Sequence, residues 1–178
     1  QRAQERPERE GQKGQEKASK PADQFPNATR QQPDAKASAK VTPKLQKMMK
    51  LYDDDKGAEA RVIADEVTAN PAANAYDKSF AGQIAGQIAY ESDDTNAALG
   101  YWNQAIESNG LDNNAHFSTM FTVAQVQLQE DKYTEALATI DRFLKESGSQ
   151  KPEQLVVKGN ALYRLERYPE AAAVLKQA

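Results

Sequence analysis

The sequence predicts an all-α solenoid of about four helix-turn-helix repeats, preceded by a tail without regular structure. From residue 41 onward apolar residues recur at steps of three and four, and no segment alternates apolar with polar residues over a useful length, so helices are expected and a sheet is not. One pattern also recurs, as DKYTEALATI at residues 131–140 and as ERYPEAAAVL at residues 166–175. Because a single helix pair cannot bury its own apolar face, this recurrence indicates stacked units.

The first 40 residues differ in composition from the rest. Residues 1–40 contain nine Lys and Arg, six Asp and Glu, seven Gln and four Pro, and Phe25 is their one large apolar side chain. Such a segment buries too little apolar surface to offset chain entropy, so we expect a disordered, low-complexity tail. Residues 41–178 are long enough to form a core and constitute the repeat domain.

The first unit begins at Thr42 and Pro43, because a hydroxyl can cap free N–H groups and Pro suits the first turn of a helix. Its first helix continues to about Tyr52 and breaks at the acidic stretch DDDKG, which we interpret as a turn between helices. Its second helix covers about residues 58–69 and ends before Pro71. The first unit therefore spans about residues 41–71.

Three further units follow, each with a polar turn between its two helices. The expected helices are 76–90 with 96–107, 115–129 with 134–145, and 153–165 with 169–178. The corresponding units are about 76–110, 113–148 and 152–178.

Alanines mark the same place in the second helix of every unit. Ala60, Ala98, Ala136 and Ala171 are spaced 38, 38 and 35 residues apart. Small residues also occur in the first helices, at Gly86, Ala124 and Gly159. Small side chains on both partners let two helices approach closely, so we expect these positions at the helix contacts.

The order of a small residue, Tyr, Ala, a large apolar residue and Ala in residues 152–178 resembles the tetratricopeptide repeat family. The third unit resembles it well, the second less closely, and the first only in its second helix. The spacing of 38 residues exceeds the usual 34 or so of the family, which places extra residues in the linkers. NAALGYWNQAI, residues 96–106, is also similar to Sel1-like repeats, the alternative family. The resemblance implies a right-handed superhelix whose first helices line a concave groove for protein segments.

Composition argues against other classes of function. The chain has no Cys and one His, His116, which we expect at a helix start, so typical zinc sites and His-based triads lack their residues. No glycine-rich phosphate loop follows a strand, and we expect no catalysis, cofactor or metal. Residues 41–178 carry 14 basic and 20 acidic residues, a balance that disfavours nucleic acid, and no apolar run is long enough to span a membrane.

Amide and aromatic side chains recur on one face of the expected first helices. Steps of three and four place them together, and they suit an extended peptide because amides bond backbone groups while aromatics offer flat apolar area. Packing against neighbouring helices is an equal alternative for the apolar positions, which are Leu45, Met49, Phe121, Leu128 and Val156. The predicted partner-binding residues are Tyr52, Phe80, Gln83, Gln87, Tyr90, Phe121, Gln125, Asn160, Tyr163 and Arg164.

We therefore expect a noncatalytic protein-protein interaction module, an adaptor or assembly factor, with a protein or peptide partner. The alternatives are a self-associating helical spacer and the helical domain of a larger protein. No polar capping helix follows Leu175, so the last unit is expected to continue or to form a homo-oligomer. The polar tail after an N-terminal Gln favours a bacterial periplasmic or secreted protein, with a cytoplasmic adaptor as the alternative.

Overall fold

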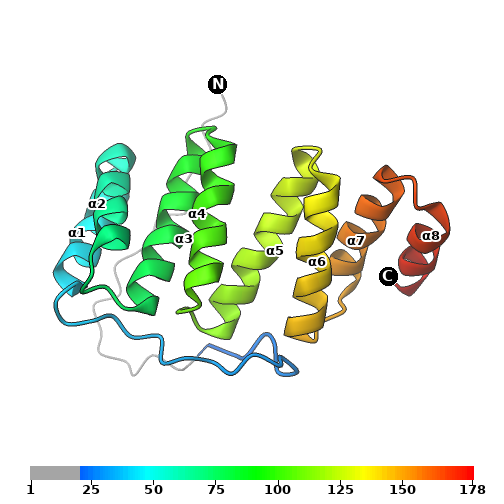
Figure 1. Cartoon of the computed structure of the whole chain (residues 1–178), viewed down its shortest axis with the longest axis horizontal. Coiled ribbons are helices and arrows are strands. Elements are labelled where there is room, and N and C mark those ends of the chain that lie inside the picture. The colour runs from blue at the N-terminus through cyan, green and yellow to red at the C-terminus, as the bar shows by residue number, and fades with distance from the viewer. Residues whose placement is uncertain (1–20) are drawn as a thin grey trace.

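The computed structural model describes residues 21–178, and these residues contain eight α-helices and no strand. Figure 1 shows the helices side by side in one row of antiparallel pairs. The helices are α1 (Thr42–Asp53), α2 (Gly57–Ala69), α3 (Ala75–Glu91), α4 (Thr95–Ser108), α5 (Asn113–Gln129), α6 (Tyr133–Ser147), α7 (Pro152–Arg164) and α8 (Tyr168–Gln177). The predicted all-α solenoid of four helix pairs is confirmed.

The helices start in different ways. At α3, Asn74 and Asp77 form a capping box, in which the Asp77 amide donates to Asn74 Oδ1 at 2.8 Å and the Asn74 amide donates to Asp77 Oδ2 at 2.9 Å. The cap expected from Thr42 is wrong, because its hydroxyl donates instead to the Ser38 carbonyl, at 2.7 Å. The turn before α1 supplies this acceptor, and α1 has no side-chain cap.

In all four pairs, the same type of turn, hereafter the closing turn, connects the first helix to the second. An acidic residue with φ of 60–61° stands in each: Asp55, Asp93, Asp131 and Glu166. The next residue donates its amide hydrogen to a carbonyl five residues earlier, as from Lys56 to Leu51 at 2.8 Å and from Arg167 to Leu162 at 2.9 Å. This is the Schellman hydrogen bond of a helix C-terminus. The interpretation of the stretch DDDKG as a turn is confirmed.

Small residues lie at the contacts between paired helices, as predicted. A Cβ added to Gly86 would lie 2.4 Å from the Trp102 ring, and one added to Gly159 would lie 2.4 Å from Leu175 Cδ2. The four repeated alanines of α2, α4, α6 and α8 are all buried. The apolar core divides into two clusters, one formed by α1, α2 and part of α3, and one that continues from α3 to α8.

Residues 21–40, hereafter the strap, contain no helix but pack against the repeat domain. Figure 1 shows the strap passing below the helix ends, from α1 to α6. Phe25 is 7% exposed, and its ring centroid lies 5.3 Å from that of Phe117 and 5.8 Å from that of Phe143. The predicted disorder is therefore wrong for residues 21–40, because a few anchoring side chains hold a segment whose average composition is polar. The rest of the predicted tail, residues 1–20, lies outside the described residues.

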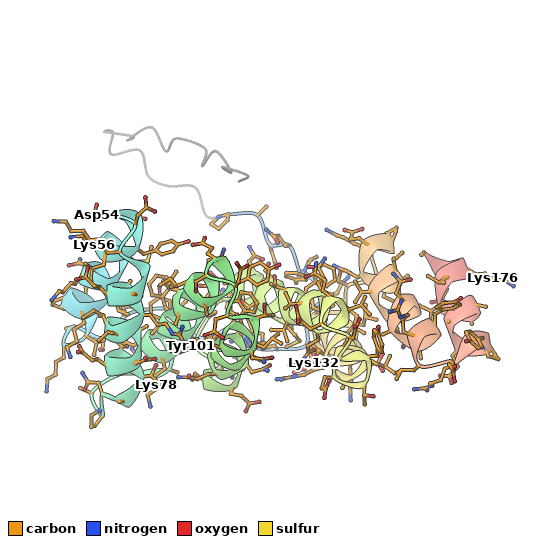
Figure 2. The ribbon with its side chains drawn as sticks, turned by 90° about the horizontal axis from the view of Figure 1, so that it is seen from above. Asp54, Lys56, Lys78, Tyr101, Lys132 and Lys176 are labelled. Carbon is orange, nitrogen blue, oxygen red and sulfur yellow. The ribbon has the colours of Figure 1, made fainter. Side chains whose placement is uncertain are left out.

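The odd-numbered helices form the inner row of the solenoid. α1 contacts α3 and α5 contacts α7 across unit boundaries, whereas no comparable contact joins two even-numbered helices among residues 21–178. The odd-numbered helices therefore lie on the concave side. Figure 2 looks along the helices and shows Asp54 and Lys56 at one end of the row, Lys176 at the other, and Tyr101 and Lys132 between them.

Candidate functional site: the concave groove

A row of exposed amides crosses the inner side of the solenoid. Gln87 of α3, Gln125 of α5 and Asn160 of α7 occupy the same place in successive units, 38 and 35 residues apart, and all three are exposed. The Gln87 amide nitrogen donates to Glu91 Oε1 at 3.2 Å, which orients its carbonyl oxygen. We call these three residues the amide row.

Three residues further along the same helices lies a row of mostly aromatic side chains. Tyr90 is 39% exposed and Tyr163 is 57% exposed, with the half-buried Leu128 at the equivalent place between them. Tyr52 begins the row in the first unit and donates its hydroxyl hydrogen to Glu91 Oε1 at 2.8 Å. The Tyr90 ring rests against Trp102, with centroids 5.7 Å apart, so the core holds it in place while its other side faces solvent.

An apolar cleft opens between α1 and α3. It has a volume of about 600 Å³, and its lining includes Leu45, Met49, Tyr76 and Phe80. The Phe80 and Tyr76 rings stack at 5.8 Å with an interplanar angle of 13°. Leu45 is buried and belongs to the core, so it serves only as part of the cleft wall.

A second cleft, of about 360 Å³, lies where α5, α6 and α7 meet. Its lining consists of Leu128, Tyr133, Asn160, Tyr163 and Arg164. The Arg164 guanidinium lies over the Tyr133 ring, 5.0 Å from its centroid, and donates from Nε to the Tyr133 hydroxyl at 3.1 Å. The hydrogen bond to Tyr133 also raises the pKa of Arg164. This cleft brings together amide, aromatic and cationic groups that the sequence predicted separately.

Four of the predicted site residues are half-buried and contribute less to the inner surface than the others: Tyr52, Phe80, Gln83 and Phe121. The Phe121 ring lies 5.4 Å from that of Phe143, so much of its surface serves the core. The structure places all ten predicted residues on the odd-numbered helices, and it brings the last three, Asn160, Tyr163 and Arg164, into one cleft.

Three residues of this surface were missed by the sequence reasoning. Tyr76 stacks on Phe80, Tyr133 supports Arg164, and Glu91 joins Tyr52 to Gln87. Glu91 could have been identified from the repeat register. It stands 73 residues before Arg164, which is the sum of the repeat spacings 38 and 35, so the two residues occupy equivalent positions. The expected helices 115–129 and 134–145 leave Tyr133 in the turn between them, and its position in the sequence does not reveal its contact with Arg164 of the next unit.

The same register position carries a graded charge along the groove. It holds Asp53, Glu91, Gln129 and Arg164 in units one to four, and all four side chains are exposed. At this position the charge therefore changes from acidic in the first two units to basic in the fourth, where Arg164 lies 3.8 Å from Asp131 Oδ1.

Stacked helix pairs with small residues at their contacts, a common closing turn and an open inner row define a helical-repeat protein of the tetratricopeptide type. The chain belongs to the family described as anaphase-promoting complex, cyclosome, subunit 3, a tetratricopeptide-type family whose sequence model matches residues 60–178. The match begins within α2, in keeping with the weak resemblance of the first helix. Among curated proteins, no sequence matches this chain.

Solved structures of MamA, a tetratricopeptide repeat protein, have a similar fold. One has a TM-score of 0.58 at 15% identity and covers 77% of this chain and 75% of its own. Another has a TM-score of 0.56 at 15% identity and covers 78% of this chain and 73% of its own. Identity at this level shows a shared fold. Within residues 21–178, no helix is long and apolar enough to cross a membrane.

Proposed function

We propose that this protein is a noncatalytic adaptor or assembly factor that binds an extended segment of a partner protein along its concave groove. The observation that carries the proposal is the amide row, which repeats one exposed amide per unit on three inner helices. An amide offers both a donor and an acceptor, so it can bond the backbone of a segment of any sequence. The family supports the same class of function, since tetratricopeptide repeats are typically protein-interaction modules.

The aromatic side chains beside the amide row would supply most of the binding energy. Tyr90 and Tyr163 are exposed yet packed on one side, against Trp102 and Tyr168 respectively. A side chain that is already held loses little conformational freedom on binding, and partly buried aromatics are frequent anchors of interfaces. The apolar cleft between α1 and α3 is a second anchoring place, suited to one large apolar side chain of the partner.

The graded charge gives the groove a direction. A segment with a basic residue toward Asp53 and Glu91, and an acidic residue toward Arg164, complements the groove in one orientation and opposes it in the other. Exposed charges contribute more to orientation and association rate than to affinity, so reversal of one charge should change preference among partners before it abolishes binding.

Selection from a displayed peptide library tests this proposal. Peptides are selected on the immobilised chain, and the affinity of the best is measured by calorimetry for the parent, Gln125→Ala, Tyr163→Ala and the control Asn103→Ala, whose side chain is exposed on the even-numbered α4. We expect Tyr163→Ala to weaken binding by about 1–3 kcal/mol and Asn103→Ala to leave it unchanged. Weakening by Asn103→Ala alone would place the partner on the convex side and contradict the proposal.

A second candidate function, a self-associating spacer, rests on the last unit. Leu175 is 39% exposed, whereas Ala64, Trp102 and Ile140 at the same place in the other units are buried. The face of α8 that a following unit would cover is therefore open in this chain, and a second copy can cover it.

A further inference from the structure

The strap crosses the repeat units in reverse order, along the edge formed by the loops between units. Phe25 lies at α5 and α6, Arg30 lies at the loop between α4 and α5, and Ser38 lies at the start of α3. Solenoid units ordinarily contact only their neighbours, and each boundary can flex on its own. A segment fixed at several units couples boundaries that are otherwise independent.

The Arg30 anchor is made of hydrogen bonds. Its guanidinium donates from Nε to Asn109 Oδ1, from Nη1 to Asn113 Oδ1 and from Nη2 to the Leu111 carbonyl, each at 2.8 Å. Burial of this group lowers the pKa of Arg30. One strap residue thus holds the end of α4 and the start of α5 together.

The Phe25 anchor is apolar. Its ring fills a site between Phe117 of α5 and Phe143 of α6 and belongs to the larger of the two core clusters. Nearby, the Thr29 amide donates to the Glu146 carbonyl at 2.9 Å, which satisfies one of the free carbonyls at the end of α6. A Cβ on Gly148 would lie 2.5 Å from the Asn27 carbonyl oxygen, so the strap backbone lies directly on this helix end.

The Ser38 anchor involves a buried carboxylate. Asp77 is fully buried and accepts hydrogen bonds from the Ser38 hydroxyl at 2.7 Å and the Ser38 amide at 3.2 Å, besides its capping bond with Asn74. A buried carboxylate that loses such donors is destabilised, so this contact holds the strap at α3. Ala37, next to this anchor, packs against the smaller core cluster.

The strap therefore joins the two apolar clusters of the solenoid, since Phe25 lies in one and Ala37 packs against the other. We propose that the strap is a brace, with Phe25, Arg30 and Ser38 as positioning residues that fix the curvature across the first three units. Residues 25–38 have a finite contour length, so their three anchors limit how far the loop edge can open. If the proposed function is right, the brace also sets the distance between the amides of the groove, and this consequence rests on that function.

Distances between spin labels test the brace without any partner. The chain has no Cys, so Gln46→Cys on α1 and Gln125→Cys on α5, both exposed, give one defined pair of labels. The distance distribution is measured by pulsed electron resonance in the parent, in Phe25→Ala, in Arg30→Gln and in Gln31→Ala. Gln31 is an exposed strap residue and provides the matched control.

We expect a narrow distribution in the parent and in Gln31→Ala, and a broader or shifted one in Phe25→Ala and Arg30→Gln. Trypsin cleavage after Lys36 should accelerate in the same two variants, because the strap leaves the domain surface. Arg30→Gln leaves the apolar site of Phe25 filled, so it reports on the brace even if Phe25→Ala fails to fold. An unchanged distribution in a variant that keeps its helical circular dichroism would overturn the proposal, whether or not peptide binding in the groove is found.

Discussion

His116 shows how much a residue's surroundings depend on distant parts of the chain. It lies in the first turn of α5, as the sequence predicted, but is only 1% exposed, and its ring centroid lies 5.0 Å from that of Phe117. Burial lowers its pKa from 6.5 to about 4, helped by the positive charges of Arg30 and Arg142. The imidazole is therefore neutral at pH 7. The sequence alone did not reveal this, because Arg30 belongs to the segment expected to be disordered.

The low pKa of His116 predicts a loss of stability in mild acid. As pH falls from 6.5 toward 4, the unfolded chain binds a proton at His116 that the folded chain does not, so acid favours unfolding. Above pH 6.5 the residue is neutral in both states and has no effect. At about pH 5 the expected loss from this residue is roughly 2 kcal/mol.

Urea unfolding of the parent and of His116→Gln at about pH 7.5 and about pH 5 measures this effect. The parent should lose roughly 2 kcal/mol more than the variant, because the glutamine does not titrate. Glu107 and Glu146, which line the same cleft as the histidine, are present in both proteins, so their contributions cancel in the comparison. Equal losses in the two proteins would contradict the assignment.

The acidic residues in the four closing turns have an energetic cost. Glu166 has a φ of 61°, a conformation that glycine adopts readily and other residues rarely do. We expect Glu166→Gly to stabilise the fold by roughly 0.5–1 kcal/mol, since relief of backbone strain outweighs the added entropy of the unfolded chain. Thermal melting checks this, with Ala138→Gly, an exposed residue in the interior of α6, as a control that should be destabilised by about 1 kcal/mol.

At the level of the helices, a substitution at the contact between paired helices should lower the free energy of unfolding more than a substitution in the groove. Ala136 of α6 is fully buried between paired helices, so Ala136→Leu overpacks the contact and should cost about 1–3 kcal/mol. Tyr163 is largely exposed, and Tyr163→Ala should cost less than about 1 kcal/mol. Chemical unfolding of the two variants measures both. Similar losses would show that Tyr163 belongs to the core and would remove it from the groove.

The elements differ in how well the sequence predicts them. The helices and their pairing follow from the spacing of apolar residues and from the repeated alanines, both of which can be recognised in short segments of the sequence. The structure of the strap does not follow from local sequence. It depends on contacts of Phe25 and Arg30 with residues about 80 to 120 positions away, which are Asn113, Phe117 and Phe143. Composition averages over such single anchors and therefore predicted disorder.

The groove was also predicted only in part, because some of its contacts join residues that are far apart in the sequence. Face periodicity placed the amides and tyrosines on the inner helices, since register within one helix needs no long-range information. The supporting contacts join different helices, as Arg164 does with Tyr133 and Tyr52 does with Glu91. Such pairs become visible only when the stacking of the units is known.

For the whole molecule, the two ends of the solenoid differ. Three polar residues of α1 stand one repeat of 38 residues before three apolar residues of α3: Gln46, Lys47 and Lys50 correspond to Ile84, Ala85 and Ile88. In α3 these positions pack against the preceding unit, whereas in α1 they carry polar side chains. The α1 end is capped by these residues, whereas the α8 end exposes Leu175. Self-association, if it occurs, should therefore join two α8 ends rather than an α1 end to an α8 end.

Sedimentation velocity tests this expectation. The parent should form dimers as concentration rises, and Leu175→Lys should shift the equilibrium toward monomer because it places a charge on the exposed apolar face. Val62→Lys, which changes an exposed apolar residue on α2, far from the α8 face, should leave the equilibrium unchanged. The same response in both variants would exclude the α8 face as the contact.

The central claim is that the inner row binds a partner segment, and the side-chain amide resonances of the chain test it most directly. A peptide selected for binding is added to isotope-labelled protein, and the NH₂ signals of Gln87, Gln125 and Asn160 are followed together with that of Asn103, an exposed residue on the even-numbered α4. We predict that the three groove amides shift and saturate together while Asn103 does not move. Shifts at Asn103 with unchanged groove amides would contradict the account.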